Sequence, residues 1–170
     1  MSQITQTKPK YILIIMAVIG LLLCTYALMI KSIVCKNSLF ILGAGLLAIS
    51  SYLEKEFFFA GLESIVIINA ILSLFNIPIY ANAIILAFLL VLMLTFIIRT
   101  SGKITLQLII GSIGLTCLSC GIIFISNMIM FIAGIILSIY SCLSIRAGFK
   151  VGWVFLILNI IFSIVALTQI

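Results

Sequence analysis

The sequence lacks the residues from which most soluble active sites are built. It has no His and no Asp, and two of its three acidic residues, Glu54 and Glu56, lie in one short segment. A nucleophile–His–carboxylate triad or a metal site of His and carboxylate ligands cannot be assembled from this set. The glycines do not form a phosphate-binding loop either. We therefore expect a protein that is not an enzyme and that holds no metal and no cofactor.

Charge of either sign is scarce. Only 7% of the residues are charged and 66% are hydrophobic, against about 25% and about 45–50% in soluble domains. So few polar residues cannot cover the surface of a soluble domain of this size, so we expect lipid to surround much of the protein. The net charge of +6 is spread in ones and twos between apolar runs. Nucleic-acid binding is not expected, because no basic groove with interleaved aromatic residues is available.

What the sequence has in abundance is long apolar runs, each close to the length of about twenty residues that crosses a bilayer as a helix. We predict an all-α, polytopic bundle of about seven transmembrane helices, with the boundaries 11–30, 37–53, 57–77, 81–98, 104–125, 127–145 and 151–168. Residues 1–10 form a short tail and residues 11–170 one transmembrane domain. The break at Ser126 carries no charge, and without it the number of helices falls to six.

Lys and Arg in short loops predict the orientation, since they accumulate on the cytoplasmic side. Two basic residues, Lys31 and Lys36, lie on one side of the predicted bundle. Seven lie on the side of the N-terminus: Lys8, Lys10, Lys55, Arg99, Lys103, Arg146 and Lys150. We therefore expect a cytoplasmic N-terminus and an external C-terminus in the cell (inner) membrane.

A shift of ninety residues aligns the third predicted helix with the seventh. The identical pairs include Leu47/Leu137, Ser51/Ser141, Asn69/Asn159 and Ser73/Ser163. The pattern predicts two parallel three-helix repeats, 11–77 and 104–168, joined by the helix 81–98. Parallel repeats are one of the two common plans of secondary transporters.

This plan resembles the three-one-three transporter group, which includes the SWEET sugar transporters, the PnuC nicotinamide-riboside transporters and small YgjV-like inner-membrane proteins. The resemblance rests on the segment 42–50 of the second helix and on Asn69 and Asn159. It implies that these two amides, in the last helix of each repeat, contact the substrate. The chain has no proline–glutamine motif of the SWEET type, and Trp153 is its only tryptophan, so neither sugar nor nicotinamide is implied.

Three polar residues inside the predicted helices are the candidate site. Asn69 and Asn159 either bind a small polar solute or hydrogen-bond between helices as structural groups. Glu63 is the only acidic residue within a predicted span, and intramembrane carboxylates often couple, gate or attract a cation. The alternatives for Glu63 are a structural ion pair with Arg146 or Lys150, or a carboxyl group held neutral near the interface.

The function that we expect is transport of a small polar metabolite, and two alternatives stay open. One is a non-transporting subunit that packs against a larger complex, and self-association also stays open. The other is a membrane thiol oxidoreductase that uses Cys117 and Cys120. Against the latter, the cysteines extend a stripe of small residues, Gly111, Gly114 and Gly121, that is typical of helix packing.

Overall fold

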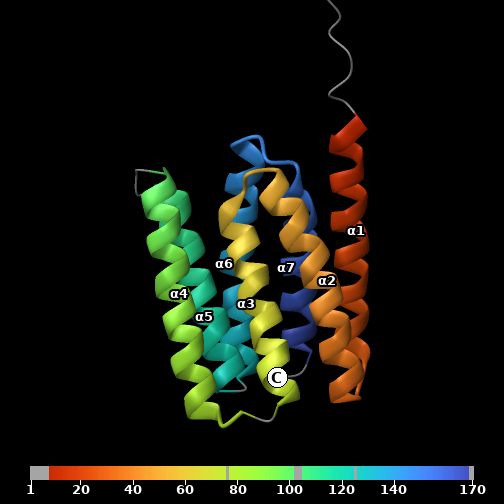
Figure 1. Cartoon of the computed structure of the whole chain (residues 1–170), viewed down its shortest axis with the longest axis vertical. Coiled ribbons are helices and arrows are strands. Elements are labelled where there is room, and N and C mark those ends of the chain that lie inside the picture. The colour runs from red at the N-terminus through yellow and green to blue at the C-terminus, as the bar shows by residue number, and fades with distance from the viewer. Residues whose placement is uncertain (1–7, 76, 102–104, 125, 169–170) are drawn as a thin grey trace, which may run out of the picture.

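A computed structural model describes residues 8–75, 77–101, 105–124 and 126–168. Within these ranges the chain forms seven α-helices and no strand, which confirms the all-α helical bundle (Figure 1). The helices are α1 (Lys8–Met29), α2 (Ile33–Leu53), α3 (Phe57–Leu74), α4 (Ile79–Ser101), α5 (Leu106–Ile123), α6 (Asn127–Arg146) and α7 (Val151–Leu167).

The uncharged break at Ser126 is real. Ser126 has an extended backbone and caps α6, because its hydroxyl accepts a hydrogen bond from the backbone N–H of Ile129 at 3.5 Å. A serine in this position satisfies one of the free N–H groups of the first turn. The alternative with six helices is therefore wrong.

Several helices extend beyond the apolar runs. α1 begins at Lys8, α2 begins at Ile33, and α4 includes Arg99 in its last turn. Long basic side chains can sit on the end of a transmembrane helix because the charged group reaches the interface while the stem stays in apolar surroundings. Lys36 therefore lies in the first turn of α2 rather than in a loop.

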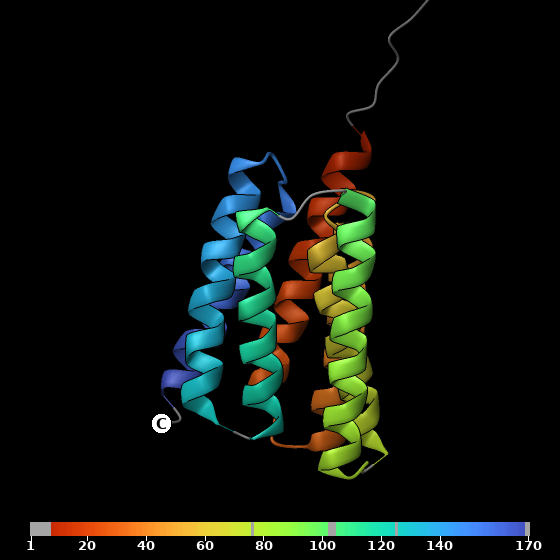
Figure 2. The same cartoon turned by 90° about the vertical axis from the view of Figure 1, so that its left-hand side faces the viewer.

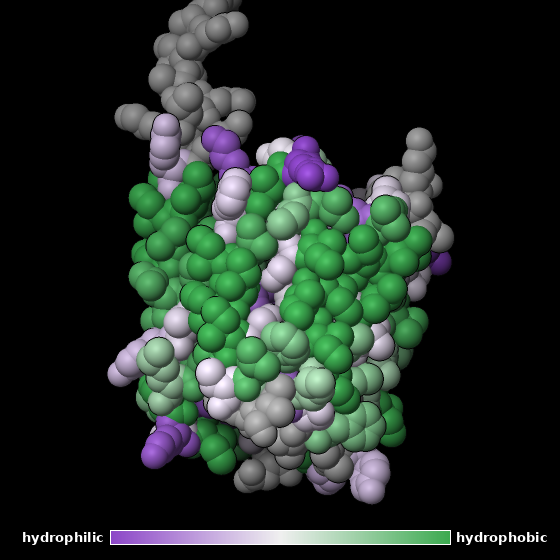
Figure 3. Space-filling model, turned by 180° about the vertical axis from the view of Figure 1, so that it is seen from behind, coloured by the Kyte–Doolittle hydropathy of each residue, from purple (hydrophilic) through white to green (hydrophobic). Residues whose placement is uncertain are grey.

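Five of the helices are long and apolar enough to cross a membrane, namely α1, α2, α3, α4 and α6. α5 and α7 are shorter apolar helices, and the 17 residues of α7 lie at the lower limit of about 17–25 residues for a span. Large apolar side chains such as Leu22, Ile84 and Phe88 are exposed. The face of the molecule seen in Figure 3 is hydrophobic across its middle, with hydrophilic residues toward its two ends. The protein is a multi-pass membrane protein.

The helices form two rows that meet at both edges. α2 packs between α1 and α3, and α6 packs between α5 and α7. The rows join because α1 contacts α7 and α3 contacts α5, while α4 packs outside against α3 and α5 (Figures 1 and 2). We call the end with the start of α1 and the α2–α3 and α6–α7 turns the Glu56 end, and the opposite end the Lys36 end. Tyr11, Tyr52 and Trp153 are exposed toward the Glu56 end and Tyr80 at the other, as an aromatic belt requires.

The central helices of the two rows are alike in detail. Ser51 donates to the carbonyl of Leu47 and Ser141 donates to the carbonyl of Leu137, each at 2.8 Å and fully buried. The two-repeat organisation stays a prediction, and these matched contacts support it.

Glycines let the helices of each row approach closely. A Cβ added at Gly20 of α1 would lie 2.7 Å from the carbonyl oxygen of Gly43 and 2.9 Å from the side chain of Leu47. In the other row, a Cβ added at Gly114 of α5 would lie 2.9 Å from the side chain of Leu137. Leu47 and Leu137 form one of the pairs of the ninety-residue shift, so the same residue faces a glycine in both rows.

Candidate functional site

A cavity of about 330 Å³ lies between the two rows of helices, within the usual range of about 300–1,000 Å³ for ligand pockets. Its lining comes from α1, α2, α3, α5, α6 and α7, and among the described residues α4 contributes none. The residues near its mouth, including Lys36, Asn37 and Asn127, belong to the first turns of α2 and α6, so the cavity opens toward the Lys36 end.

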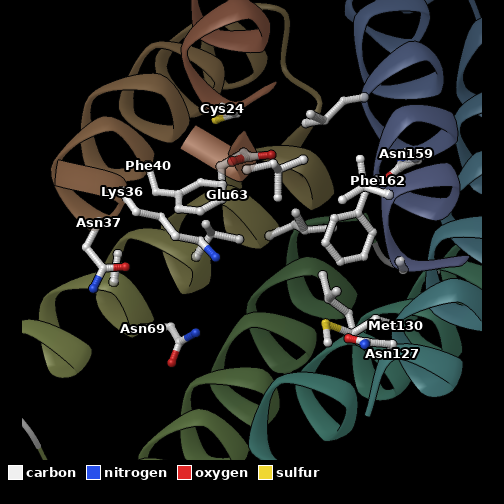
Figure 4. Close-up of a pocket in the computed structure, with 18 residues that line it drawn as sticks. Cys24, Lys36, Asn37, Phe40, Glu63, Asn69, Asn127, Met130, Asn159 and Phe162 are labelled. Atoms are coloured by element: carbon white, nitrogen blue, oxygen red, sulfur yellow. The ribbon is translucent and has the colours of Figure 1, made fainter. Parts of the chain in front are cut away.

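Asn69, Asn159 and Glu63 all line this cavity, so the structure brings the three predicted site residues together (Figure 4). Glu63 lies six residues after the start of α3, or about 9 Å along the helix at about 1.5 Å per residue. Asn69 lies two turns nearer the mouth on the same helix. Whether these residues bind a solute stays a prediction.

Both asparagines also hydrogen-bond between helices. The amide nitrogen of Asn159 donates to the hydroxyl of Ser141 in α6 at 3.3 Å. Asn69 accepts a hydrogen bond from the amide of Asn82 in α4 at 3.1 Å. The proposed repeat pair thus has different partners, and Asn159 is buried whereas Asn69 is half-buried. Interhelical bonding and solute binding are compatible, because each amide has further hydrogen-bonding capacity.

Glu63 has no ion pair with Arg146 or Lys150, and the expectation of such a pair is wrong. Both basic residues are exposed and outside the cavity lining, because Arg146 ends α6 and Lys150 precedes α7 at the Glu56 end. Glu63 is only 2% exposed. Among the described residues, none makes an ion pair or a side-chain hydrogen bond with its carboxyl group.

The cation that shares the cavity with Glu63 is Lys36. Its side chain enters the cavity from the first turn of α2 (Figure 4), and it is half-buried. Lys36 was expected in a turn as an orientation signal. The apolar run gave no sign that the helix starts before it, so its position in the cavity could not be inferred.

At the opposite end of the bundle, a hydrogen-bond network joins the two rows of helices. It is centred on Glu56, which precedes α3. The hydroxyls of Tyr140 and Ser144 in α6 both donate to Oε1 of Glu56 at 2.6 Å, and the amide of Gln107 in α5 donates to Ser144 at 2.8 Å. Glu56 is buried, with 6% of its surface exposed. The α2–α3 turn is therefore fastened to the other row of helices.

The electrostatics of this turn favour the neutral form of Glu56. Burial raises the pKa of Glu56 above its ordinary value, and the carboxylate of Glu54 adds to this, whereas the hydrogen bonds from Ser144 and Tyr140 act in the opposite direction. Glu54 itself accepts a hydrogen bond from the backbone N–H of Val151 at 2.9 Å. A carboxylate at the start of α7 is favourable because the helix dipole is positive there.

An aromatic layer separates the Glu56 network from the cavity. Phe59 of α3 stacks on Phe155 of α7 with ring centroids 3.8 Å apart and planes 3° apart. Tyr140 packs against Phe59 at 5.0 Å and against Phe58 at 4.3 Å. Phe59 lies one helical turn before Glu63, so this layer lies beyond the inner end of the cavity, and none of its rings belongs to the cavity lining.

Sequence reasoning missed the Glu56 network because Glu54 and Glu56 were interpreted only as a break between helices. One signal was available. Tyr140 and Ser144 are four residues apart and therefore on one face of a helix, and polar groups inside a membrane need partners. This spacing does not identify their partner, because Glu56 lies 84 positions from Tyr140 and 88 positions from Ser144 in the sequence.

Cys117 and Cys120 are half-buried, and neither forms a disulfide. The glycines beside them pack against α6: an added Cβ at Gly111 would meet Tyr140 at 2.6 Å, and one at Gly121 would meet Met130 at 2.6 Å. Among the described residues no three His, Cys, Asp or Glu side chains lie close enough together to hold a metal ion. The stripe of small residues on α5 thus serves helix packing.

No protein-family model matches the sequence, and no curated protein and no solved structure matches it either. The resemblance to the three-one-three group therefore stays a prediction.

Proposed function

We propose that the protein transports a small polar solute across the membrane through the cavity between its two rows of helices. The observation that carries the proposal is the cavity itself, since it is lined by all six helices of the two predicted repeats and contains Glu63, Asn69 and Asn159. A membrane bundle that only packs against partners has no need for an unpaired carboxyl group in an internal cavity such as that of Glu63, because a buried polar group without a partner lowers its stability.

The closed end supports transport rather than simple binding. The cavity opens at the Lys36 end, whereas the aromatic layer and the Glu56 network close the other end. Alternating access requires one end to close while the other opens. In our proposal the rows rock against each other, the hydrogen bonds from Tyr140 and Ser144 to Glu56 break, and the Phe59–Phe155 stack separates. With the predicted orientation, the described state faces outward.

The test separates solute binding from structural bonding by Asn159. Ser141 is fully buried and is not part of the cavity lining. Ser141→Ala therefore removes the interhelical bond and leaves the amide in the cavity, whereas Asn159→Ala removes both. Purified protein is screened with small polar metabolites for thermal stabilisation. A ligand at about 100 times its Kd adds about 2.7 kcal/mol to the free energy of unfolding.

We expect a ligand to stabilise the wild type and Ser141→Ala, and to lose its effect in Asn159→Ala. The same comparison applies to Asn69→Ala and Asn82→Ala, because Asn82 bonds Asn69 from outside the cavity. Identified ligands are then tested for uptake into proteoliposomes. If no metabolite stabilises the wild type, or if ligand effects persist in both Asn69→Ala and Asn159→Ala, the proposal is wrong.

A further inference from the structure

The cavity contains one acidic and one basic side chain that do not pair. The carboxylate of Glu63 and the ammonium of Lys36 both line it, and neither makes an ion pair with any described residue. Figure 4 shows both side chains in the same space. Glu63 is only 2% exposed, and a carboxyl that is buried without a partner ionises only at a high cost in free energy. A cation that enters the cavity would supply the partner that its ionised form needs.

The two groups lie at different depths. Glu63 is six residues from the start of α3 at the Glu56 end, at the inner end of the cavity and about one helical turn beyond Phe59 of the aromatic layer. Lys36 is three residues from the start of α2 at the Lys36 end. A solute that pairs with both Glu63 and Lys36 must place a positive group at the inner end of the cavity and a negative group toward its mouth. A solute with a positive charge alone would satisfy Glu63 but would meet the like charge of Lys36 at the entrance.

Apolar side chains occupy much of the remaining wall. Phe40 of α2 and Phe162 of α7 face the cavity from the two rows (Figure 4), together with Leu62 and Leu158. A strongly hydrated sugar would leave many hydroxyl groups unpaired against such a wall. A solute with an apolar body fits better.

We propose that the transported solute is a zwitterion with an apolar side chain, of the α-amino-acid class, whose ammonium group binds Glu63 and whose carboxylate is oriented by Lys36. The proposal rests on the transport function above and adds the class of substrate. Asn69 and Asn159 supply hydrogen bonds to the polar end groups. Glu63 is a binding residue in this account, and Lys36 gives charge complementarity at the mouth.

The test uses three probes of the same shape. These are leucine, its decarboxylated amine 3-methylbutylamine and its deaminated acid 4-methylpentanoate, together with the corresponding sets for valine, methionine and phenylalanine. Thermal stabilisation is measured on the wild type, Glu63→Gln, Lys36→Gln and the matched control Lys31→Gln, whose lysine is exposed at the same end but outside the cavity. Glucose and a nucleoside serve as uncharged polar probes.

We expect the zwitterion of at least one set to bind at least tenfold more tightly than its amine and its acid. Glu63→Gln should abolish this binding, Lys36→Gln should weaken it at least tenfold, and Lys31→Gln should leave it within twofold. If Glu63→Gln does not fold, the three probes on the wild type and on Lys36→Gln decide the question.

Two other outcomes have distinct meanings. Stabilisation by an uncharged solute or by an amine alone, lost in Asn159→Ala, overturns the zwitterion proposal and leaves the transport function standing. No stabilisation by any probe of any class overturns both.

Discussion

Glu56 shows how a single carboxylate can hold two distant parts of a membrane protein together. Its Oε1 accepts hydrogen bonds from Tyr140 and Ser144, which are both buried, and the ring of Tyr140 packs against Phe58 and Phe59. Unpaired buried hydroxyl groups cost about 1–3 kcal/mol each. Both hydroxyls depend on one acceptor. Substitution of Glu56 should therefore lower the free energy of unfolding more than substitution of an exposed loop glutamate would.

We expect Glu56→Ala to lower the free energy of unfolding by about 2–4 kcal/mol, since it leaves both hydroxyls without their acceptor. Glu56→Gln should cost less than about 1 kcal/mol, because its amide oxygen can accept the same two hydrogen bonds. Thermal unfolding in detergent measures both. Equal effects of the two substitutions would show that the network contributes little.

Stability should also depend on pH through Glu56. Its pKa is raised in the folded protein, so the native state binds the proton more tightly than the unfolded state does. This contribution is fully present below the ordinary pKa of about 4.5 and is lost as the pH rises through the raised value. The wild type should therefore lose stability relative to Glu56→Gln as the pH increases above about 4.5. If the stability of the wild type relative to Glu56→Gln stays constant or increases over this pH range, the pKa of Glu56 is not raised in the folded protein.

At the scale of the helices, the apolar runs predicted every element and its direction, because a backbone in lipid must satisfy its own hydrogen bonds and only helices can do so here. The ends were predicted less well. Lys36 and Arg99 lie within helices, since long side chains can reach the interface from a terminal turn. The local sequence does not decide whether such a residue belongs to the helix, because the same lysine is compatible with a loop.

The predicted repeat is supported by packing at positions that a single shift of the sequence does not align. The equivalent leucines Leu47 and Leu137 are ninety positions apart, but the glycines that face them, Gly20 and Gly114, are 94 apart. One fixed shift therefore aligns the later helices of the two rows and misaligns the first. If the repeat is real, the leucine that each glycine faces identifies equivalent positions that the ninety-residue shift does not align.

The close contact between α1 and α2 can be tested by substituting two glycines of α2. A methyl group at Gly43 would lie 2.8 Å from the carbonyl oxygen of Gly20 and 2.7 Å from Sγ of Cys24, whereas one at Gly45 has nothing within 4 Å. We expect Gly43→Ala to destabilise the protein by about 1–3 kcal/mol, because the helices must separate. Gly45→Ala should be neutral or stabilise by up to about 1 kcal/mol through helix propensity. Similar unfolding temperatures of the two variants would mean that this close approach is absent.

For the whole molecule, the sequence predicted which residues would meet better than it predicted what they would do. Asn69, Asn159 and Glu63 converge on one cavity because each is a polar group on an apolar helix that must turn inward. Their hydrogen-bond partners, Asn82 and Ser141, and the entry of Lys36 depend on how the rows pack. Such packing follows from contacts among many helices and has no local signal.

The orientation of the bundle can be tested with thiols at its two ends. Cys35 is exposed beside Lys36, and Lys150 is exposed at the Glu56 end. In a background with the other cysteines changed to serine, a membrane-impermeant maleimide added to intact cells should modify Cys35. It should leave Lys150→Cys unmodified until the membrane is permeabilised. The excess of basic residues near the Glu56 end motivates this expectation. The reverse pattern would invert the direction in which the cavity faces, and equal labelling of both positions would contradict the placement of the two turns on opposite sides of the membrane.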